Sequence, residues 1–98
     1  MLKAIIINPK DNVATVINHI ASGQIVQVQS GSGEVVCELQ ATEAIPFGHK
    51  IALIDIENHD EILKYGEVMG LATKGIKKGD YVHTHNVRSC LLPGSHYY

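Results

Sequence analysis

Aromatic residues are scarce in this sequence, which has no tryptophan, one phenylalanine and four tyrosines in 98 residues. Basic residues are also few, because eight Lys and Arg stand against ten Asp and Glu, which gives a net charge of -2 with neutral histidine. Domains that bind nucleic acid typically carry a basic stripe, often with interleaved aromatic side chains. Nucleic acid is therefore not an expected partner.

Long apolar runs are missing as well. No stretch approaches the ~20 consecutive apolar residues of a membrane-spanning helix. The apolar start Met1–Ile7 is too short for a signal peptide and has no small-residue cleavage site. We therefore expect no membrane partner and a cytoplasmic location, in which Cys37 and Cys90 stay reduced.

The length and a hydrophobic fraction of 45% predict a single globular domain over residues 1–98. We find no internal repeat, low-complexity tract or linker, and residues 87–98, which include Pro93 and Gly94, are predicted to be an irregular tail. A domain of this size has room for one core but not for a deep, enclosed active site as well. Chemistry on a sizeable substrate would therefore need a second chain.

Short strands are predicted over most of the chain, so the expected fold class is mainly β. Apolar and polar residues alternate on both sides of the turn Ser30–Gly33, which predicts a hairpin with Cys37 on its apolar face. The apolar run Ile51–Ile56 predicts a strand that is buried on both faces. Interior glycines such as Gly70 indicate bends or close approach of two backbones. Further strands are expected at Leu2–Ile7, Ile62–Tyr65, Val68–Ala72 and Tyr81–Asn86.

One short helix is predicted among these strands, over residues 12–22. Asp11 or Asn12 would cap its N-terminus with a side-chain oxygen, and Gly23 would end it. The apolar residues between them recur at helical spacing and would form one buried face. These residues are Val13, Val16, Ile17 and Ile20.

Six histidines occur in the sequence, and the spacing of two makes them candidate site residues. His83 and His85 lie two residues apart in a predicted strand, so both imidazoles would point to one face and could bind one divalent metal ion. A pair of histidines does not by itself complete a metal site, and two hydrogen-bonded or solvated side chains are the alternative. His19 and His59 are expected at the surface.

Two other segments carry side chains that could bind an acid. His49 and Lys50 follow a turn that leads into the buried strand, from which they could reach over the rim of a pocket and hold a carboxylate. The segment Lys64–Glu67 could bind an acidic, hydroxylated substrate. The ordinary alternatives are a turn histidine beside a lysine that reaches solvent, and a charged β-turn.

Four motifs follow one another along the chain, at Ile45–Leu53, Lys64–Glu67, Gly70–Thr73 and Val82–Asn86. Together they resemble the SAF domain of the altronate and galactarate dehydratases, and the related small subunit of sulfolactate sulfo-lyase. The resemblance covers residues 10–88. Residues 57–62 depart from the pattern, because relatives tend to carry a glycine-containing turn there.

The resemblance implies a β-clip fold, which is a long hairpin folded over on itself, and a lyase that removes water or sulfite from an acidic polyol. It also implies a divalent metal, iron or manganese, and a large catalytic subunit as partner. It makes His49, His83 and His85 catalytic residues, with His83 and His85 as metal ligands. The residues it assigns to substrate binding are Lys50, Lys64, Tyr65 and Asn86.

Three functions stay open at this point. The leading one is the small subunit of a metal-dependent hydro-lyase that dehydrates a sugar acid of the altronate or galactarate type and needs a large subunit for activity. The second is the small subunit of a sulfolactate sulfo-lyase. The third is a non-catalytic module for carbohydrate binding or assembly, because a fold does not fix a function. A homo-oligomer is compatible with all three.

Overall fold

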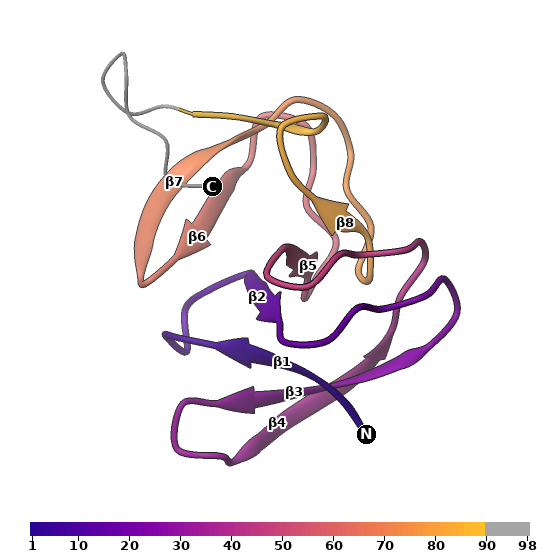
Figure 1. The fold of residues 1–98 in the computed structure, drawn as a ribbon. Helices are drawn as coiled ribbons and strands as arrows, with labels where there is room; N and C mark the ends of the chain where they lie inside the picture. Colours follow the sequence, from indigo (N-terminus) through magenta and orange to yellow (C-terminus); the bar gives the residue numbers. More distant parts are fainter. Residues whose placement is uncertain (90–98) are drawn as a thin grey trace.

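The computed structural model describes residues 1–89, which form nine strands and, within that range, no helix (Figure 1). The predicted mainly β fold class is therefore confirmed. Within the same range, no helix is long and apolar enough to cross a membrane. The strands are β1 (Leu2–Ile6), β2 (Val13–Val16), β3 (Ile25–Ser30), β4 (Val35–Gln40), β5 (Lys50–Ala52), β6 (Glu61–Lys64), β7 (Glu67–Ala72), β8 (Tyr81–Val82) and β9 (Val87–Arg88).

The strands form two sheets, and in Figure 1 β6 and β7 of the smaller sheet lie at the upper left while β1, β3 and β4 of the larger one lie at the bottom. The larger sheet has the order β4-β3-β1-β2-β5-β8, and the smaller has the order β6-β7-β9. All neighbouring pairs are antiparallel except β1 and β3, which run parallel. The predicted hairpin is β3 and β4, and the half-buried Cys37 lies opposite Val28 and packs against the core.

Two strands of the larger sheet, β2 and β5, contribute to both hydrophobic cores. Ala14 and Ile51 belong to the core under the larger sheet, whereas Val13 and Ala52 belong to the core shared with β6, β7 and β9. Successive side chains of a strand point to opposite faces, so a strand between two cores needs apolar residues on both of its faces. The prediction of a strand buried on both faces is confirmed, although β5 ends at Ala52 and Ile54 is exposed.

One turn geometry occurs four times in the described chain, although no repeat is predicted from the sequence. Each copy begins with a buried isoleucine, and the copies pair through mutual backbone hydrogen bonds, Ile20 with Ile45 and Ile56 with Ile76. Three residues further on, the backbone φ is positive, as the third residue of a type II turn requires. These positions are Gly23, Gly48, His59 and Gly79.

The predicted helix over residues 12–22 is wrong, because Val13–Val16 form β2, which pairs with β1 and β5. Asp11 and Asn12, which were expected to cap this helix, bind the segment around β6 instead. Both carboxylate oxygens of Asp11 accept hydrogen bonds from backbone N–H groups of Tyr65 and Gly66 in the β6–β7 turn. Three of the four residues of β2 are β-branched, which favours a strand.

The predicted strand Tyr81–Asn86 is also wrong beyond Val82. Residues 83–86 form a turn, after which Val87 and Arg88 pair with β7 as β9 instead of belonging to an irregular tail. The close approach predicted at Gly70 is confirmed, because a Cβ there would lie 2.4 Å from the carbonyl oxygen of Arg88. Residues 90–98, with Cys90 and His96, lie outside the described part of the chain.

Candidate functional site

The turn after β8 is held in shape by the buried side chain of Asn86. Its Oδ1 accepts a hydrogen bond from the His83 backbone N–H at 2.9 Å, and its Nδ2 donates to the Tyr81 carbonyl at 2.8 Å. Its backbone N–H also donates to the His83 carbonyl. Both polar ends of the Asn86 amide are therefore used inside the loop, where they position His83 and His85.

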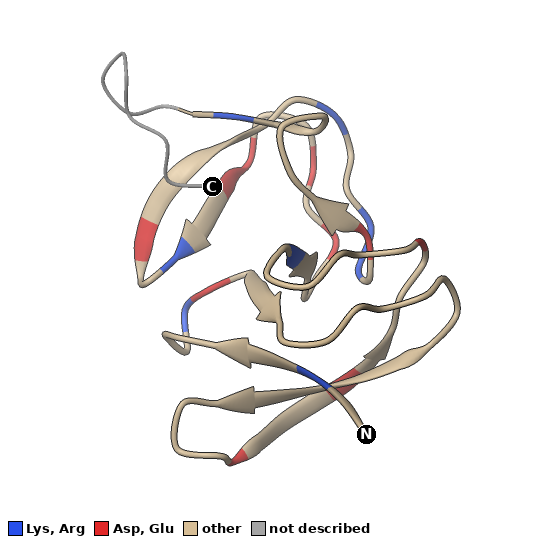
Figure 2. Cartoon of the chain, viewed as in Figure 1, with Lys and Arg blue, Asp and Glu red and all other residues tan. Residues whose placement is uncertain are grey.

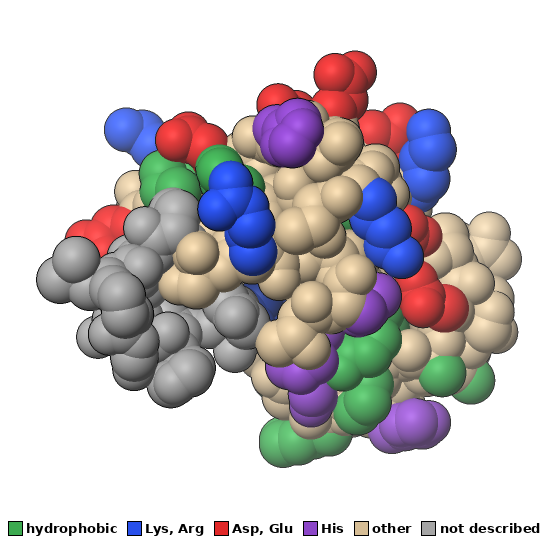
Figure 3. Space-filling model, turned by 90° about the horizontal axis from the view of Figure 1, so that it is seen from above, with side chains coloured by type: hydrophobic (Ala, Val, Ile, Leu, Met, Phe, Trp, Pro, Cys, Tyr) green, Lys and Arg blue, Asp and Glu red, His purple; other side chains and the backbone are tan. Residues whose placement is uncertain are grey.

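Tyr81 lies at the centre of the three histidines that the sequence singled out. Its ring is stacked on His83 with 5.7 Å between centroids, and it lies 5.2 Å from the His85 ring. His49 reaches the same place from the turn before β5, with its ring 4.8 Å from that of His83. The four rings form the histidine cluster, and Figure 3 shows histidine side chains beside hydrophobic ones on the face seen from above.

Strand pairing brings these residues together. β5 and β8 are antiparallel neighbours in which Lys50 lies opposite Val82 and Ile51 opposite Tyr81. His49, just before β5, therefore lies beside the residues that leave β8. From the sequence, Tyr81 is named only as the first residue of a predicted strand, and the signal that could have found it is its two-residue spacing from His83.

Lys50 is the buried cation of this region. It lies between Thr15 of β2 and Val82 of β8, with only 5% of its surface exposed. The pKa of Lys50 is lowered from 10.5 to about 8, mainly because burial penalises the charged ammonium and also because the charge of Lys64 acts in the same direction. Among residues 1–89, no carboxylate opposes these two effects by raising the pKa of Lys50 as an ion-pair partner would.

The pKa of His83 is lowered from its ordinary value of 6.5, first by burial and then by the nearby charges of His49, Lys50 and His85. His83 is therefore neutral near pH 7. A neutral imidazole can accept a proton or coordinate a metal ion, whereas an imidazolium can do neither.

Lys64 and Tyr65 lie at the junction of β6 and the turn that follows it. The Lys64 ammonium lies 4.9 Å from the centre of the Tyr65 ring. Tyr65 and Gly66 both have positive φ, and Asp11 holds their backbone N–H groups, so the turn is fixed while the Tyr65 ring stays 54% exposed. The charge of Lys64 lowers the pKa of Lys50, which is next to His49 of the histidine cluster. Tyr65 makes no ring contact with the described histidines.

A divalent metal ion would need at least a third ligand beside His83 and His85. Within residues 1–89, no group of three His, Cys, Asp or Glu side chains is arranged to hold a metal ion. The described residues therefore do not form a complete metal centre, and the metal prediction gains no support from this part of the chain.

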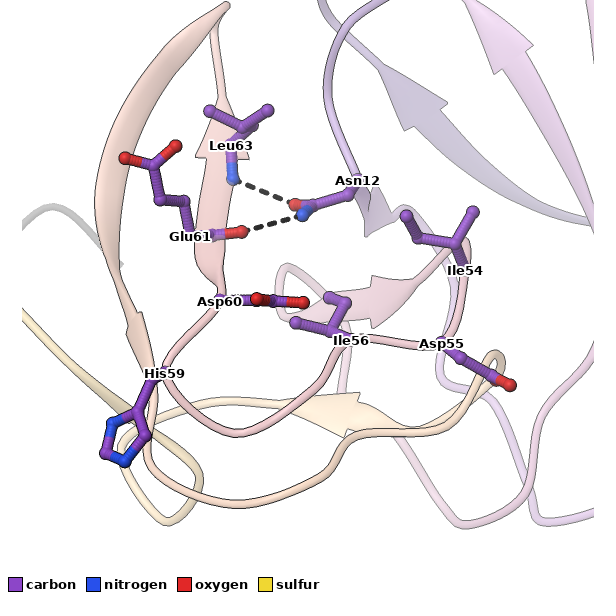
Figure 4. Close-up of a pocket in the computed structure, with 8 residues that line it drawn as sticks. All are labelled: Asn12, Ile54, Asp55, Ile56, His59, Asp60, Glu61 and Leu63. Atoms are coloured by element: carbon purple, nitrogen blue, oxygen red, sulfur yellow. Dashed lines mark hydrogen bonds between the residues drawn. The ribbon is translucent and has the colours of Figure 1, made fainter.

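An open pocket of about 320 Å³ is lined by none of the cluster residues (Figure 4). Its polar side chains serve the fold. The Asn12 amide donates to the Glu61 carbonyl and accepts from the Leu63 N–H, which joins β2 to β6. Asp60 accepts a hydrogen bond from the Glu57 N–H of its own turn, and Asp55 accepts one from the Lys78 N–H of another turn. The histidine cluster, and not this pocket, is the better candidate for chemistry.

Fold and cluster together define a small all-β domain that presents histidine, tyrosine and lysine side chains where two strands leave one sheet. Residues 2–90 match the family described as the altronate/galactarate dehydratase SAF domain. The chain belongs to this family, which confirms the resemblance seen in the sequence.

The curated relatives include proteins of two architectures. The chain is 28% identical over 74 residues to the (2R)-sulfolactate sulfo-lyase subunit alpha of Chromohalobacter salexigens, covering 76% of this chain and 79% of that protein. It is 36% identical over 76 residues to the galactarate dehydratase (L-threo-forming) of Escherichia coli, covering 78% of this chain and 13% of the enzyme. It is 34% identical over 85 residues to the altronate dehydratase of Bacillus subtilis, covering 87% and 16%. The chain thus spans only a small part of either dehydratase.

Proposed function

We propose that this chain is the SAF subunit of a cytoplasmic lyase that dehydrates a sugar acid, and that it acts together with a large catalytic subunit. The family supports a role beside a lyase, because the relatives are lyase subunits or dehydratases. The single observation that carries the proposal is the histidine cluster beside a buried lysine whose charge no carboxylate among the described residues offsets.

The chemistry of the cluster suits a hydroxy acid. Lys50 would bind the substrate carboxylate, because a buried ammonium gains a strong, charge-assisted hydrogen bond from it. Neutral His83 would accept the proton from the carbon next to that carboxylate, and His85 would be the acid that gives a proton to the departing hydroxyl, which leaves as water. His49, fixed by Tyr81, would hold the substrate hydroxyl.

The partner subunit would complete the site. The cluster lies at the domain surface, where His85 is exposed and Phe47, two residues before His49, is 69% exposed. A water-excluded site needs walls on the other side, and a partner surface packed against Phe47 would supply them. A divalent metal, iron or manganese, enters the proposal as a group held mainly by the partner, since the described residues lack a third ligand.

A sulfo-lyase is the second candidate. The observation that favours it is the similarity itself, because the chain aligns with 79% and 76% of two sulfolactate sulfo-lyase alpha subunits. The same cluster would then bind the carboxylate of sulfolactate, and sulfite instead of water would leave.

The test is a rate assay with the chain alone, and then with the large lyase subunit encoded beside its gene. We expect turnover of altronate or galactarate by the pair and none by the chain alone. His83→Ala should abolish turnover in the pair, whereas His19→Ala, which changes an exposed histidine outside the cluster, should not. Turnover by the chain alone, or full activity of His83→Ala, would contradict the proposal. Release of sulfite from sulfolactate would assign the chemistry to the second candidate.

A further inference from the structure

The outer face of the larger sheet is a surface separate from the histidine cluster. The strands β1, β3 and β4 form it, and Figure 1 shows them at the bottom of the molecule. Side chains of these strands that alternate along the chain belong to the buried core, among them Ala4, Val28 and Leu39. The side chains between them point to the opposite face, and none of these is buried. They are Lys3, Ile5, Ile25, Gln27, Gln29, Val35, Glu38 and Gln40.

Two opposite charges lie symmetrically about β3 on this face. The strand register places Lys3 of β1 and Glu38 of β4 on either side of Gln27. Figure 2 shows the basic segment of β1 and the acidic segment of β4. Two strand spacings, about 10 Å, separate their backbones. Within residues 1–89, neither side chain forms an ion pair.

Apolar residues follow the same arrangement. Ile5 of β1 and Val35 of β4 lie on either side of Gln29, whose amide donates to Gln27 along the middle strand. Ile25, on the middle strand itself, is 46% exposed, and Val35 is 57% exposed. The face thus presents β-branched side chains to water, and a second surface packed on it would remove them from water.

This arrangement is self-complementary. A two-fold axis along β3 turns the sheet over and exchanges its β1 side with its β4 side. Lys3 of one copy then faces Glu38 of the other, and this contact occurs twice. Ile5 faces Val35, and Ile25 faces its own copy. Sheets packed face to face lie about 10 Å apart, a distance that a lysine and a glutamate side chain span together.

The other charges at the margin of this face meet no like charge in that arrangement. Glu34, which precedes β4, would lie opposite the end of β1, and the α-amino group of Met1 would lie opposite Gln40. Edge-to-edge pairing of two β4 strands is the less favourable alternative, because Glu38 would approach the same carboxylate of the second copy.

We propose that the outer face of β1, β3 and β4 binds a second copy of the chain, in a symmetric sheet-on-sheet dimer in which Lys3 of each copy pairs with Glu38 of the other. No residue of the histidine cluster belongs to this face. The dimer therefore leaves the cluster free to contact a large subunit.

Sedimentation equilibrium of the full chain at several protein concentrations tests the proposal. We expect a reversible equilibrium between monomer and dimer that shifts towards monomer as salt is added. Lys3→Glu or Glu38→Lys alone places like charges opposite each other at both contacts, and each should weaken the dimer by at least about tenfold. Lys74→Glu and Glu57→Lys make the same charge changes at exposed positions outside this face and should leave it unchanged.

Mixing the two single variants is the decisive step. In a mixed dimer an ammonium again faces a carboxylate at both contacts, so an equimolar mixture should associate as tightly as the original chain. The double variant Lys3→Glu/Glu38→Lys should do the same. Ile25→Asp, on the axis, should weaken the dimer without relying on either charged residue. A monomeric original chain, a dimer that Lys3→Glu leaves intact, or a mixture that stays monomeric would overturn the proposal.

Discussion

The phenolic oxygen of Tyr81 lies 2.7 Å from Nδ1 of His49, and this hydrogen bond joins residues that are 32 positions apart in the sequence. The contact fixes the ring of His49 on one side and leaves Nε2 for another partner. When the phenol donates to Nδ1, the imidazole proton resides on Nε2, which then becomes a donor. Tyr81 is thus a positioning residue for His49, while its ring packs on His83 and His85.

Tyr81→Phe removes this hydrogen bond and keeps the aromatic ring. We expect the free energy of unfolding to fall by about 1 kcal/mol, the usual contribution of one hydrogen bond. Activity of the assembled lyase should fall more than stability suggests, by about tenfold, because His49 loses its fixed orientation. Urea unfolding and a rate assay measure the two effects, and the ring nitrogen signals of His49 in NMR report the change of tautomer. Unchanged His49 signals would contradict the positioning role.

Lys50→Met should stabilise the isolated chain at pH 7 although it removes a proposed ligand-binding group. A pKa lowered from 10.5 to about 8 corresponds to roughly 3 kcal/mol. Solvent screening near the domain surface reduces this, so we expect a gain of about 2 kcal/mol. Methionine fills a similar volume without the charge. Urea midpoints measure the gain, and Lys74→Met, at an exposed position, is the matched control. A loss of stability in Lys50→Met would show that the ammonium has a partner that stabilises it.

The lowered pKa of Lys50 should also change how the free energy of unfolding depends on pH. Between about pH 8 and pH 10.5 the unfolded chain keeps the proton on Lys50 while the folded chain has lost it, so the free energy of unfolding should rise with pH across this window. Lys50→Met should flatten that rise.

At acid pH, the lowered pKa of His83 means that the free energy of unfolding falls as the pH falls through 6.5, and His83→Gln should reduce that loss. A pH profile of urea midpoints tests both slopes, and a wild-type profile that is flat above pH 8 would contradict the burial of a charged Lys50.

Local patterns predicted most of the strands and the proximity of His49, His83 and His85, but not which residues connect distant segments. The β3–β4 hairpin follows from strict alternation around a glycine-rich turn, which is a local signal. The helix predicted over residues 12–22 failed because Asp11 is as good a partner for the distant Tyr65 N–H as for a helix N-terminus. Only the fold decides between these two uses of one carboxylate.

The histidine site was predicted for a reason that is partly wrong. His83 and His85 were placed on one face of a strand, but the strand ends at Val82 and a turn fixed by Asn86 carries both histidines. The two rings still lie together because Tyr81 packs against each of them. The low pKa of Lys50 could not be read from the sequence, since it depends on β5 lying between β2 and β8.

The turn geometry that occurs four times predicts how a substitution of His59 changes stability. At the positive-φ position of the four turns, His59 is the one residue that is not glycine. His59 has a φ of 75°, a conformation that costs a residue with a Cβ about 1–2 kcal/mol, while glycine loses part of this advantage through its greater freedom in the unfolded chain. His59→Gly should therefore raise the free energy of unfolding by about 0.5–1 kcal/mol. The reverse change at the equivalent position, Gly79→Ala, should destabilise the chain by more than 1 kcal/mol in order of magnitude, because the new Cβ would lie 2.2 Å from the Gln40 carbonyl oxygen. Gly75→Ala, where φ is not positive and nothing lies within 4 Å, is the control. Urea midpoints at unchanged slope measure all three. If His59→Gly lowers stability, the exposed imidazole makes an interaction worth more than the backbone strain, and the four turns are not equivalent.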